Sequence, residues 1–332
     1  MLNSEKGRDM QSFILRRFVQ MTVVILLLSF VCFCLMGLMP GDPVDIMISS
    51  NPKITSADVE RLKTLYGLDQ PIYVRYGNWL KDTLSGNLGH SRTYKIPTID
   101  LIGPRLWNTF LLSMGSFFLA AFIAIPIGIY SAVKKGSKFD YVSNLLAFAG
   151  ISIPSFWLGI TLIIIFSVWL KWLPAGGTET ISDSSITGFS YFLDRLKYLI
   201  LPTLSLTALQ MGSFVRYTRS AMMEVLGQDY IRTAKAKGIL KFKIIFIHAF
   251  KNALIPLITV LSISFSTIFS GAIITETIFA YQGIGKLVYD SIIANDFNVA
   301  MISFMISIGM VLFMNLVADI MYSFADPRIS YK

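Results

Sequence analysis

The stretch of sequence that decides the fold reads DYIRTAKAKG, at residues 229–238. Two long apolar runs flank it, at residues 198–214 and 253–279. Apolar runs of this length are typical of membrane-spanning helices. Membrane chains often cross from one span to the next by a short loop, whereas this chain keeps a polar segment with the signals of an ordered helix.

The ends of this segment carry helix start and stop signals. Asp229 is a favourable start, because a short side-chain acceptor satisfies the free N–H groups of a first helical turn. Gly238 is a favourable stop, because glycine adopts the left-handed conformation just beyond a helix end. Lys235 and Lys237 lie where cations stabilise the negative end of the helix dipole. We therefore expect a short capped helix at the membrane face, placed to contact a soluble partner.

Composition predicts an all-α membrane protein. Hydrophobic residues make up 54% of the 332 residues and charged residues 15%, with a mean hydropathy of +0.62. A soluble domain this apolar would have too little polar surface to stay in solution. Cys32 and Cys34 face nearly opposite ways on a predicted helix and cannot form a disulfide. The sequence contains no Cys/His cluster that would bind a metal and no constellation of catalytic residues typical of an enzyme. It also contains no Walker A loop with which this chain could bind ATP.

Six apolar stretches are long enough to span a membrane: residues 18–39, 106–133, 145–170, 198–214, 253–279 and 299–322. The first lacks a small-residue cleavage pattern, so we expect a retained anchor. The fourth is the shortest, and we expect it to extend toward Met223 past Arg216 and Arg219, whose long side chains reach the interface. Pro126 and Pro154 predict kinks within their spans.

The distribution of Lys and Arg predicts the orientation. Most of the 29 basic residues fall in four segments: 1–17, 134–144, 214–252 and 323–332. Basic and acidic residues balance in the opposite loops: 40–105, 171–197 and 280–298. Both termini are therefore expected in the cytoplasm. The basic pI of about 9.4 reflects this topology rather than a nucleic-acid surface, because the chain has no contiguous basic and aromatic face.

The first outer segment, residues 40–105, is predicted to be helical. Thr55 and Asp58 form a capping-box pattern, and Gly67 ends the helix that follows. Pro71 opens a second helix, which Gly86 closes. The simpler interpretation is a small packed helical cap. The functional alternative is a docking surface for another protein outside the membrane.

Two stripes of small polar and thioether side chains follow the last two spans. They are Ser262, Ser266 and Ser270 on the fifth span, with Ser303, Ser307, Met310 and Met314 on the sixth. Small polar residues in membrane helices usually mark close helix contacts, which is the simpler interpretation. The alternative is a pathway lining, since hydroxyls and flexible thioethers contact varied solutes without holding one tightly.

Four ionisable residues stand apart from these patterns. Glu276 and Asp319 fall within spans, where charge is costly. Each lies near a span end, so we expect an interfacial structural role with water in reach. His90 is expected on a surface loop, and His248 is expected to anchor the chain near the interface.

The central segment resembles a known family signature. Arg232, Thr233 and Ala234, followed after three residues by Gly238, resemble the EAA loop of bacterial type I ABC importers. The oligopeptide and dipeptide permeases carry Arg-Thr-Ala in place of Glu-Ala-Ala. Further runs resemble the B-type subunit of these permeases: Gly41-Asp42-Pro43, Tyr66-Gly67-Leu68-Asp69-Gln70-Pro71, Trp79-Leu80, Gly86-Asn87-Leu88-Gly89, Glu276-Thr277-Ile278-Phe279, Gly283-Ile284-Gly285, Asn315, Asp319 and Asp326-Pro327-Arg328. The likeness runs over nearly the whole chain.

The resemblance implies a type I ABC importer permease in the bacterial cytoplasmic membrane. It divides the chain into a first span with its cytoplasmic N-terminus (1–39), an extracytoplasmic helical segment (40–105), a transmembrane core (106–322) and a cytoplasmic tail (323–332). The coupling loop would be residues 214–252. Its ATPase contacts would be Asp229, Tyr230, Arg232, Thr233, Ala234, Lys235 and Gly238. A bulky residue at Ala234 is expected to obstruct a close-packed socket on the ATPase.

The resemblance also implies partners and a mechanism. The partners would be a second permease of the same fold, two ATPase subunits, an extracytoplasmic binding protein and membrane lipid. ATP and Mg²⁺ would be used by the ATPases, with no cofactor on this chain. Import of oligopeptides or dipeptides would follow alternating access. Similar importers move nickel chelates, opines or oligosaccharides, and a channel without ATPase partners is the alternative from another class, although no charged ring or filter sequence indicates one.

Overall fold

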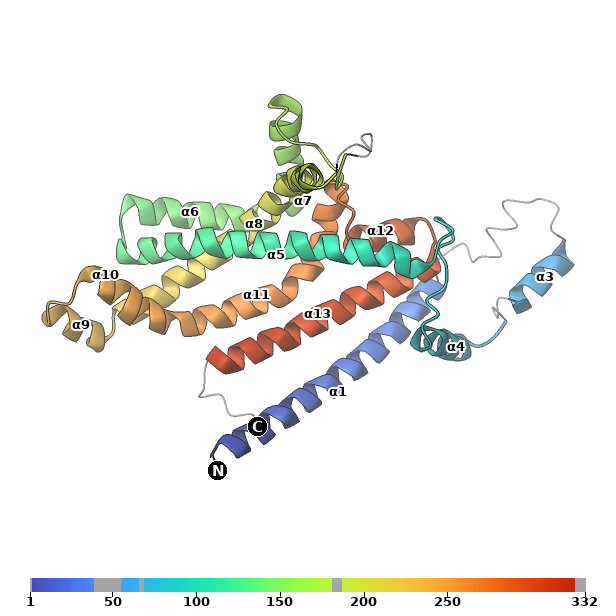
Figure 1. The fold of residues 1–332 in the computed structure, drawn as a ribbon, viewed down its shortest axis with the longest axis horizontal. Helices are drawn as coiled ribbons and strands as arrows, with labels where there is room; N and C mark the ends of the chain where they lie inside the picture. Colours follow the sequence, from blue (N-terminus) through green and yellow to red (C-terminus); the bar gives the residue numbers. More distant parts are fainter. Residues whose placement is uncertain (1, 39–54, 66–68, 181–186, 326–332) are drawn as a thin grey trace. The chain divides into compact units, whose positions relative to one another are not determined.

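The computed structural model describes residues 2–38, 55–65, 69–180 and 187–325. Within these residues the chain is helical, and its one β-bridge joins His90 to Pro97. Figure 1 shows the helices in chain order. They are α1 (Leu2–Gly37), α3 (Ser56–Leu65), α4 (Ile72–Leu84), α5 (Thr98–Val133), α6 (Lys138–Ser152), α7 (Ser155–Leu162), the π-helix η1 (Ile163–Trp169), α8 (Phe189–Leu226), α9 (Asp229–Ala236), α10 (Lys241–Lys243), the π-helix η2 (Ile244–Phe250), α11 (Lys251–Ile278), α12 (Ile284–Ile293) and α13 (Phe297–Ala325). The all-α prediction is confirmed.

Among the residues that the structure describes, five helices are long and apolar enough to cross a membrane, and a bent pair makes a sixth candidate. The bent pair joins α6 to α7 and η1 at an angle of 103°. Pro154 stands at the break as the residue before α7, so the kink predicted there is confirmed. By contrast, α5 runs through Pro126 as one helix. Helix α8 extends past Arg216 and Arg219 to Leu226, as expected for the fourth span.

The chain forms two compact units. Unit 1 comprises Met1–Leu106 and Leu287–Gly309, and unit 2 comprises Trp107–Lys286 and Met310–Lys332. In unit 1, α4 packs on α1: Tyr76 Oη lies 2.7 Å from Ser29 Oγ, and the Phe33 ring meets Tyr76 and Trp79 at centroid distances of 5.7 and 5.8 Å. These aromatic contacts stabilise the position of α4 against α1.

The predicted helix ends in the outer segment are confirmed where the structure describes them. Thr55 and Asp58 form the reciprocal capping box, with the Asp58 N–H donating to Thr55 Oγ1 and the Thr55 N–H to Asp58 Oδ2. The Thr55 hydroxyl also donates to Asp58 Oδ2 at 2.6 Å, and this bond, together with the one from the Thr55 N–H, lowers the pKa of the Asp58 carboxyl. Pro71 precedes α4, and Gly86 follows it with a φ of 87°. Gly67, the other predicted stop, lies outside the described residues.

In unit 2, α8 lies very close to two other helices, and glycine makes both approaches possible. A Cβ on Gly212 would lie 2.3 Å from the carbonyl oxygen of Ala147 in α6. A Cβ on Gly128 in α5 would lie 2.6 Å from Cβ of Thr218 in α8. Small residues at such crossings let membrane helices gain dispersion contacts along their backbones. Helices α5, α6 and α8 thus form the scaffold that carries the polar segment after α8.

Candidate functional site

The candidate site is α9, the short helix predicted at residues 229–238. Its N-terminus differs from the expectation: Gln228 is the residue before the helix, and no side chain caps it. Asp229 is instead the first helical residue, and its Oδ1 lies 3.3 Å from Arg232 Nη1 one turn later. The carboxylate still stabilises the positive end of the helix dipole, but it pairs with a side chain rather than with the free N–H groups.

The C-terminus of α9 is a Schellman motif. The Gly238 N–H donates to the Lys235 carbonyl at 3.0 Å, and the Ile239 N–H donates to the Ala234 carbonyl at 3.3 Å. Gly238 has a φ of +69°, and a Cβ there would meet no atom within 4 Å. The predicted glycine stop is therefore confirmed, and what requires glycine is the backbone conformation rather than space.

The two faces of α9 have different surroundings. Ile231 is 0% exposed and Ala234 is 6% exposed. The other predicted coupling residues of the helix are exposed: Asp229, Tyr230, Arg232, Thr233 and Lys235. The expected socket for Ala234 on a partner therefore needs correction, because this side chain packs inside its own chain. A bulky residue at 234 would disturb that core first.

The core beneath α9 connects it to four other elements. Ile231 and Ala234 belong to one apolar cluster with side chains from α5, α8, η2 and α11: Ile129, Ala132, Ala221, Met222, Ile244, Ala249 and Ala253. Close-packed interiors transmit displacement because they have little free volume. A push on the exposed face of α9 would therefore reach the ends of three membrane helices directly.

A buried ion pair lies near this cluster and was not predicted from the sequence. Asp140, at the start of α6, accepts hydrogen bonds from Arg219 Nε at 2.6 Å and Nη2 at 2.9 Å. Ser131 Oγ and the Gly136 N–H donate to the same carboxylate. Asp140 is 3% exposed. The pair connects the α5–α6 turn to α8 about two turns before α8 ends at Leu226. The sequence showed Arg219 only as a charge inside a span, and its partner lies 79 positions away.

Glu276 is fully buried, so the expectation of water in reach is wrong. Its carboxylate accepts a hydrogen bond from Thr109 Oγ1 in α5 and another, at 2.9 Å, from the N–H of Lys286. The Ile284 N–H donates to Thr109 Oγ1 at 2.8 Å, so Thr109 links α5 to the same turn. A Cβ on Gly283 would lie 2.1 Å from the carboxylate. Glu276 therefore fastens the turn between α11 and α12 to α5.

Replacing Glu276 with alanine is expected to destabilise the protein by about 1–3 kcal/mol, because the Lys286 N–H and the Thr109 hydroxyl lose their acceptor in a buried place. The temperature of half-inactivation of the purified complex measures the loss. Glu276→Gln keeps an acceptor of the same shape and is expected to lose less. Equal stability of the alanine and unaltered proteins would show that this network contributes nothing.

The predicted pathway residues lie in different surroundings. In unit 2, Ser262 is buried, and Met314 packs with Phe117 and Phe214 in a core against which Met310 lies. In unit 1, Ser303 is buried, and Ser307 Oγ donates to its carbonyl at 2.8 Å. The side chains of Ser266 and Ser270 lie outside the described residues. Asp319 and His248 are half-buried, and His90 is exposed.

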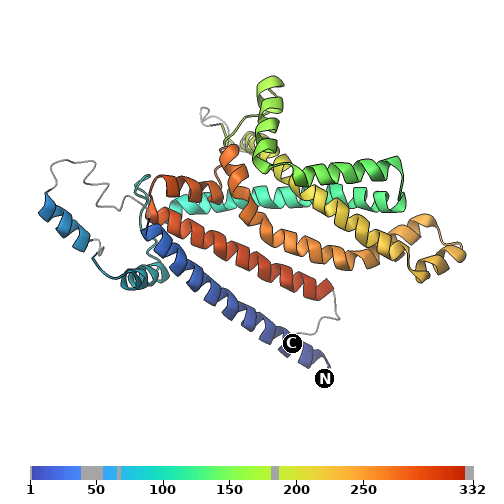
Figure 2. The same cartoon turned by 180° about the vertical axis from the view of Figure 1, so that it is seen from behind.

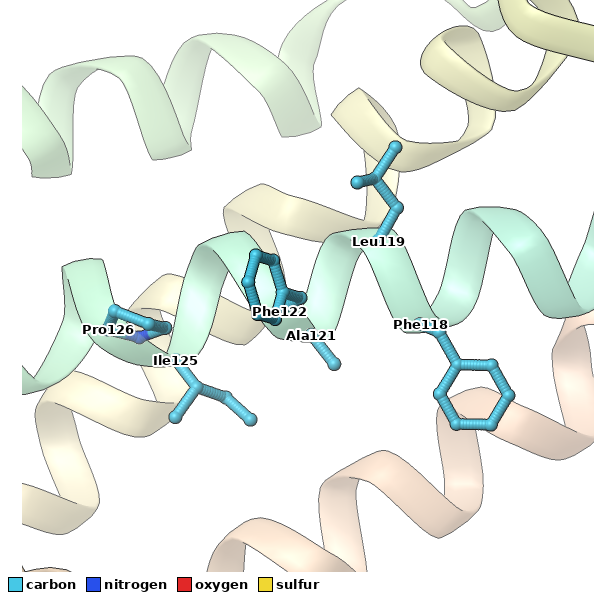
Figure 3. Close-up of a pocket in the computed structure, with 6 residues that line it drawn as sticks. All are labelled: Phe118, Leu119, Ala121, Phe122, Ile125 and Pro126. Atoms are coloured by element: carbon cyan, nitrogen blue, oxygen red, sulfur yellow. The ribbon is translucent and has the colours of Figure 1, made fainter.

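A hollow of about 630 Å³ opens beside α5 (Figure 3). Its lining residues all come from that helix and are all apolar: Phe118, Leu119, Ala121, Phe122, Ile125 and Pro126. Phe118 is 63% exposed and Phe122 is 78% exposed. Such a surface offers no polar group to orient the charged ends of a peptide, so it is a contact surface for apolar groups rather than a specific ligand site.

Comparisons with known proteins identify the family. The chain matches the model described as "Binding-protein-dependent transport system inner membrane component" over residues 124–331, and its N-terminal companion over residues 10–98. The oligopeptide transport system permease protein AppB of Bacillus subtilis is 42% identical over 323 residues, which cover 97% of this chain and 100% of the relative. The dipeptide transport system permease protein DppB of Escherichia coli K12 is 34% identical over 339 residues, with the same two coverages.

A solved structure shares the fold. The MetNI methionine ABC transporter, in an inward-facing conformation, aligns with a TM-score of 0.56 over 69% of this chain and 98% of that chain. The two are 17% identical, so this likeness shows the fold alone.

Proposed function

Because the chain belongs to the family of binding-protein-dependent transport system inner membrane components, we propose that it is the permease subunit of an ATP-driven importer for oligopeptides or dipeptides. The observation that carries the proposal is the helix α9, which leaves a polar face exposed and packs an apolar face on the chain's own core. The names of the two relatives, at 42% and 34% identity, support peptides as the cargo.

The importer would work by alternating access in a bacterial cytoplasmic membrane. This chain would pair with a second permease, two ATPases that use ATP and Mg²⁺, and an extracytoplasmic binding protein that delivers the cargo. Closure of the ATPases would move the exposed face of α9. The core that holds Ile231 and Ala234 would carry that movement to α5, α8 and α11. This chain would conduct cargo and perform no covalent chemistry.

The cargo pathway is the least constrained part of the proposal. The candidates remain Ser262, Ser266, Ser270, Ser303, Ser307, Met310 and Met314. In the described conformation Ser262 and Ser303 are buried. They would line a pathway only after the helices that cover them move, which is what alternating access requires.

Growth on peptides tests the proposed function. Deleting the gene should abolish growth on short peptides that supply a required amino acid, and it should confer resistance to toxic peptides. Free amino acids should still support growth, because they enter by other carriers. Unchanged growth of a strain with no second peptide importer would contradict the peptide assignment. Lost uptake of nickel chelates, opines or oligosaccharides instead would assign the cargo to one of those classes.

Labelling of single cysteines tests the orientation. The charge distribution predicts residues 40–105 outside and the α5–α6 and α8–α11 connections inside. Asp58, Asp82, Lys138 and Lys235 are all exposed, so each position is open to a reagent. In intact cells an impermeant maleimide should modify cysteine at positions 58 and 82 only. Modification at 138 or 235 would reverse the topology.

A further inference from the structure

The segment that follows α9 buries apolar side chains on one face and exposes large apolar side chains on the other. α10 and η2 return the chain to the α11 span. One face is buried in the core of unit 2 through Ile244 and Ala249. The opposite face exposes 42% to 69% of each of four large apolar side chains: Leu240, Phe242, Phe246 and Ile247. A surface segment of a water-exposed loop would place polar residues there, so these side chains have another environment.

Ring contacts hold these exposed aromatic side chains in place. The rings of Phe242 and Phe246 have centroids 4.6 Å apart, and those of Phe246 and Phe250 lie 6.5 Å apart. Phe250 packs in turn against the buried cluster beneath α9. The exposed apolar face is therefore an ordered surface that continues from the core.

Basic residues surround this face. Lys237, Lys241, Lys243 and Lys251 lie on either side of it, and the sequence contains no Asp or Glu from residue 230 to residue 275. A second basic and aromatic group occupies the α5–α6 turn, with exposed side chains of Lys134, Lys135 and Lys138 beside the paired rings of Tyr130 and Phe139. Figures 1 and 2 place this turn and α10 at the same end of unit 2.

We propose that residues 240–247 form a lipid-contact segment, in which Leu240, Phe242, Phe246 and Ile247 enter the boundary between headgroups and acyl chains, and Lys241 and Lys243 bind anionic lipid phosphates. Two observations identify the occupant. Lys241 begins one of the candidate membrane spans, Lys241–Phe265, so the segment continues into a helix that is long and apolar enough to cross a membrane. Aromatic side chains flanked by lysines match the chemistry of an anionic headgroup layer.

Lipid contact at this place would give the coupling loop a fixed point. η2 packs on α9 through Ile244 and also enters the α11 span. If the headgroup layer holds this segment in place, α9 would rotate about the segment as a pivot. The rest of the coupling loop would then not move together with α9. The contact itself is independent of the role of α9, whereas this consequence rests on the proposed function.

Collision rates of a nitroxide label test the contact in the assembled transporter, reconstituted in phosphatidylglycerol and phosphatidylcholine. In a chain with Cys32→Ala and Cys34→Ala, the label is attached at Phe242→Cys or Ile247→Cys. Its ratio of collisions with oxygen to collisions with a water-soluble nickel chelate should be several-fold higher than that of Asp82→Cys, an exposed site on α4. Frequent collision with the nickel chelate, or shielding from both reagents by a protein partner, would overturn the proposal.

A charge variant tests the lysines separately. The double variant Lys241→Gln and Lys243→Gln should lower the collision ratio of a label at position 242. In the chain that keeps both lysines, reconstitution in phosphatidylcholine without phosphatidylglycerol should lower the same ratio. These surface changes leave the buried face of η2 intact, so folding is not at issue. An unchanged ratio in both comparisons would overturn the role of the lysines. If the variant loses peptide uptake while the collision ratio at position 242 stays high, the result would contradict the proposed pivot of α9. It would leave the lipid contact itself intact.

Discussion

Replacing Arg219 with leucine is expected to destabilise the protein by about 3–5 kcal/mol, because it leaves the carboxylate of Asp140 charged and buried without its cation. The Arg219 side chain is 23% exposed and that of Asp140 only 5%, so solvent replaces little of the lost interaction. The expected result is a lower temperature of half-inactivation of the purified transporter and a smaller yield of assembled complex.

Two further variants identify the cause of that loss. Arg219→Lys keeps the charge but cannot form the bidentate pair, so an intermediate loss is expected. Adding Asp140→Asn to Arg219→Leu removes the unpaired charge and keeps one acceptor oxygen for either Ser131 or Gly136, so it should restore part of the stability. If Arg219→Leu retains full stability, the ion pair does not brace α6 against α8.

Replacing Gly238 with valine is expected to reduce ATP-driven uptake by about tenfold or more. The φ of +69° is unfavourable for a β-branched residue by about 1–2 kcal/mol or more. The end of α9 would reorganise to relieve that strain and would present a different face to the ATPase. The complex should still assemble, because a Cβ at 238 meets no neighbouring atom. Uptake and ATP hydrolysis by reconstituted complex measure the effect.

Matched variants separate coupling from general damage. Gly238→Asn is expected to retain most uptake, since asparagine tolerates the left-handed conformation. Gly86 also has a positive φ and open space around it, but it follows α4 in unit 1. Gly86→Val carries the same local strain and should leave the coupling of ATP hydrolysis to uptake intact. Normal uptake by Gly238→Val would remove α9 as the coupling helix.

The sequence predicted those features of the fold that depend on local signals. Apolar length predicted the spans, Pro154 predicted the break between α6 and α7, and Gly238 predicted the end of α9. Each of these signals acts within a few residues of the structure it determines. The predicted start of α9 at Asp229 is confirmed, but the expected side-chain cap is wrong. A capping pattern does not distinguish the residue before a helix from its first residue, and here Arg232 pairs with the carboxylate.

The sequence could not predict contacts between distant elements. Asp140 and Arg219 are 79 positions apart, and Thr109 and Glu276 are 167 apart, so neither pair leaves a pattern in one sequence. The burial of Ala234 is a similar case, because helical spacing shows that Ile231 and Ala234 share a face but not what covers it. The cluster from α5, α8, η2 and α11 that covers this face appears only once the helices are packed together.

Uptake of labelled peptide by vesicles tests the central claim, that this chain is an importer subunit driven by separate ATPases. The vesicles would contain this chain, its partner permease and the two ATPases, with the binding protein outside and ATP inside. The account predicts accumulation of peptide above the outside concentration, and none when ATP or the binding protein is omitted. Peptide flux down its gradient by this chain without ATP and binding protein would contradict the claim and identify a channel.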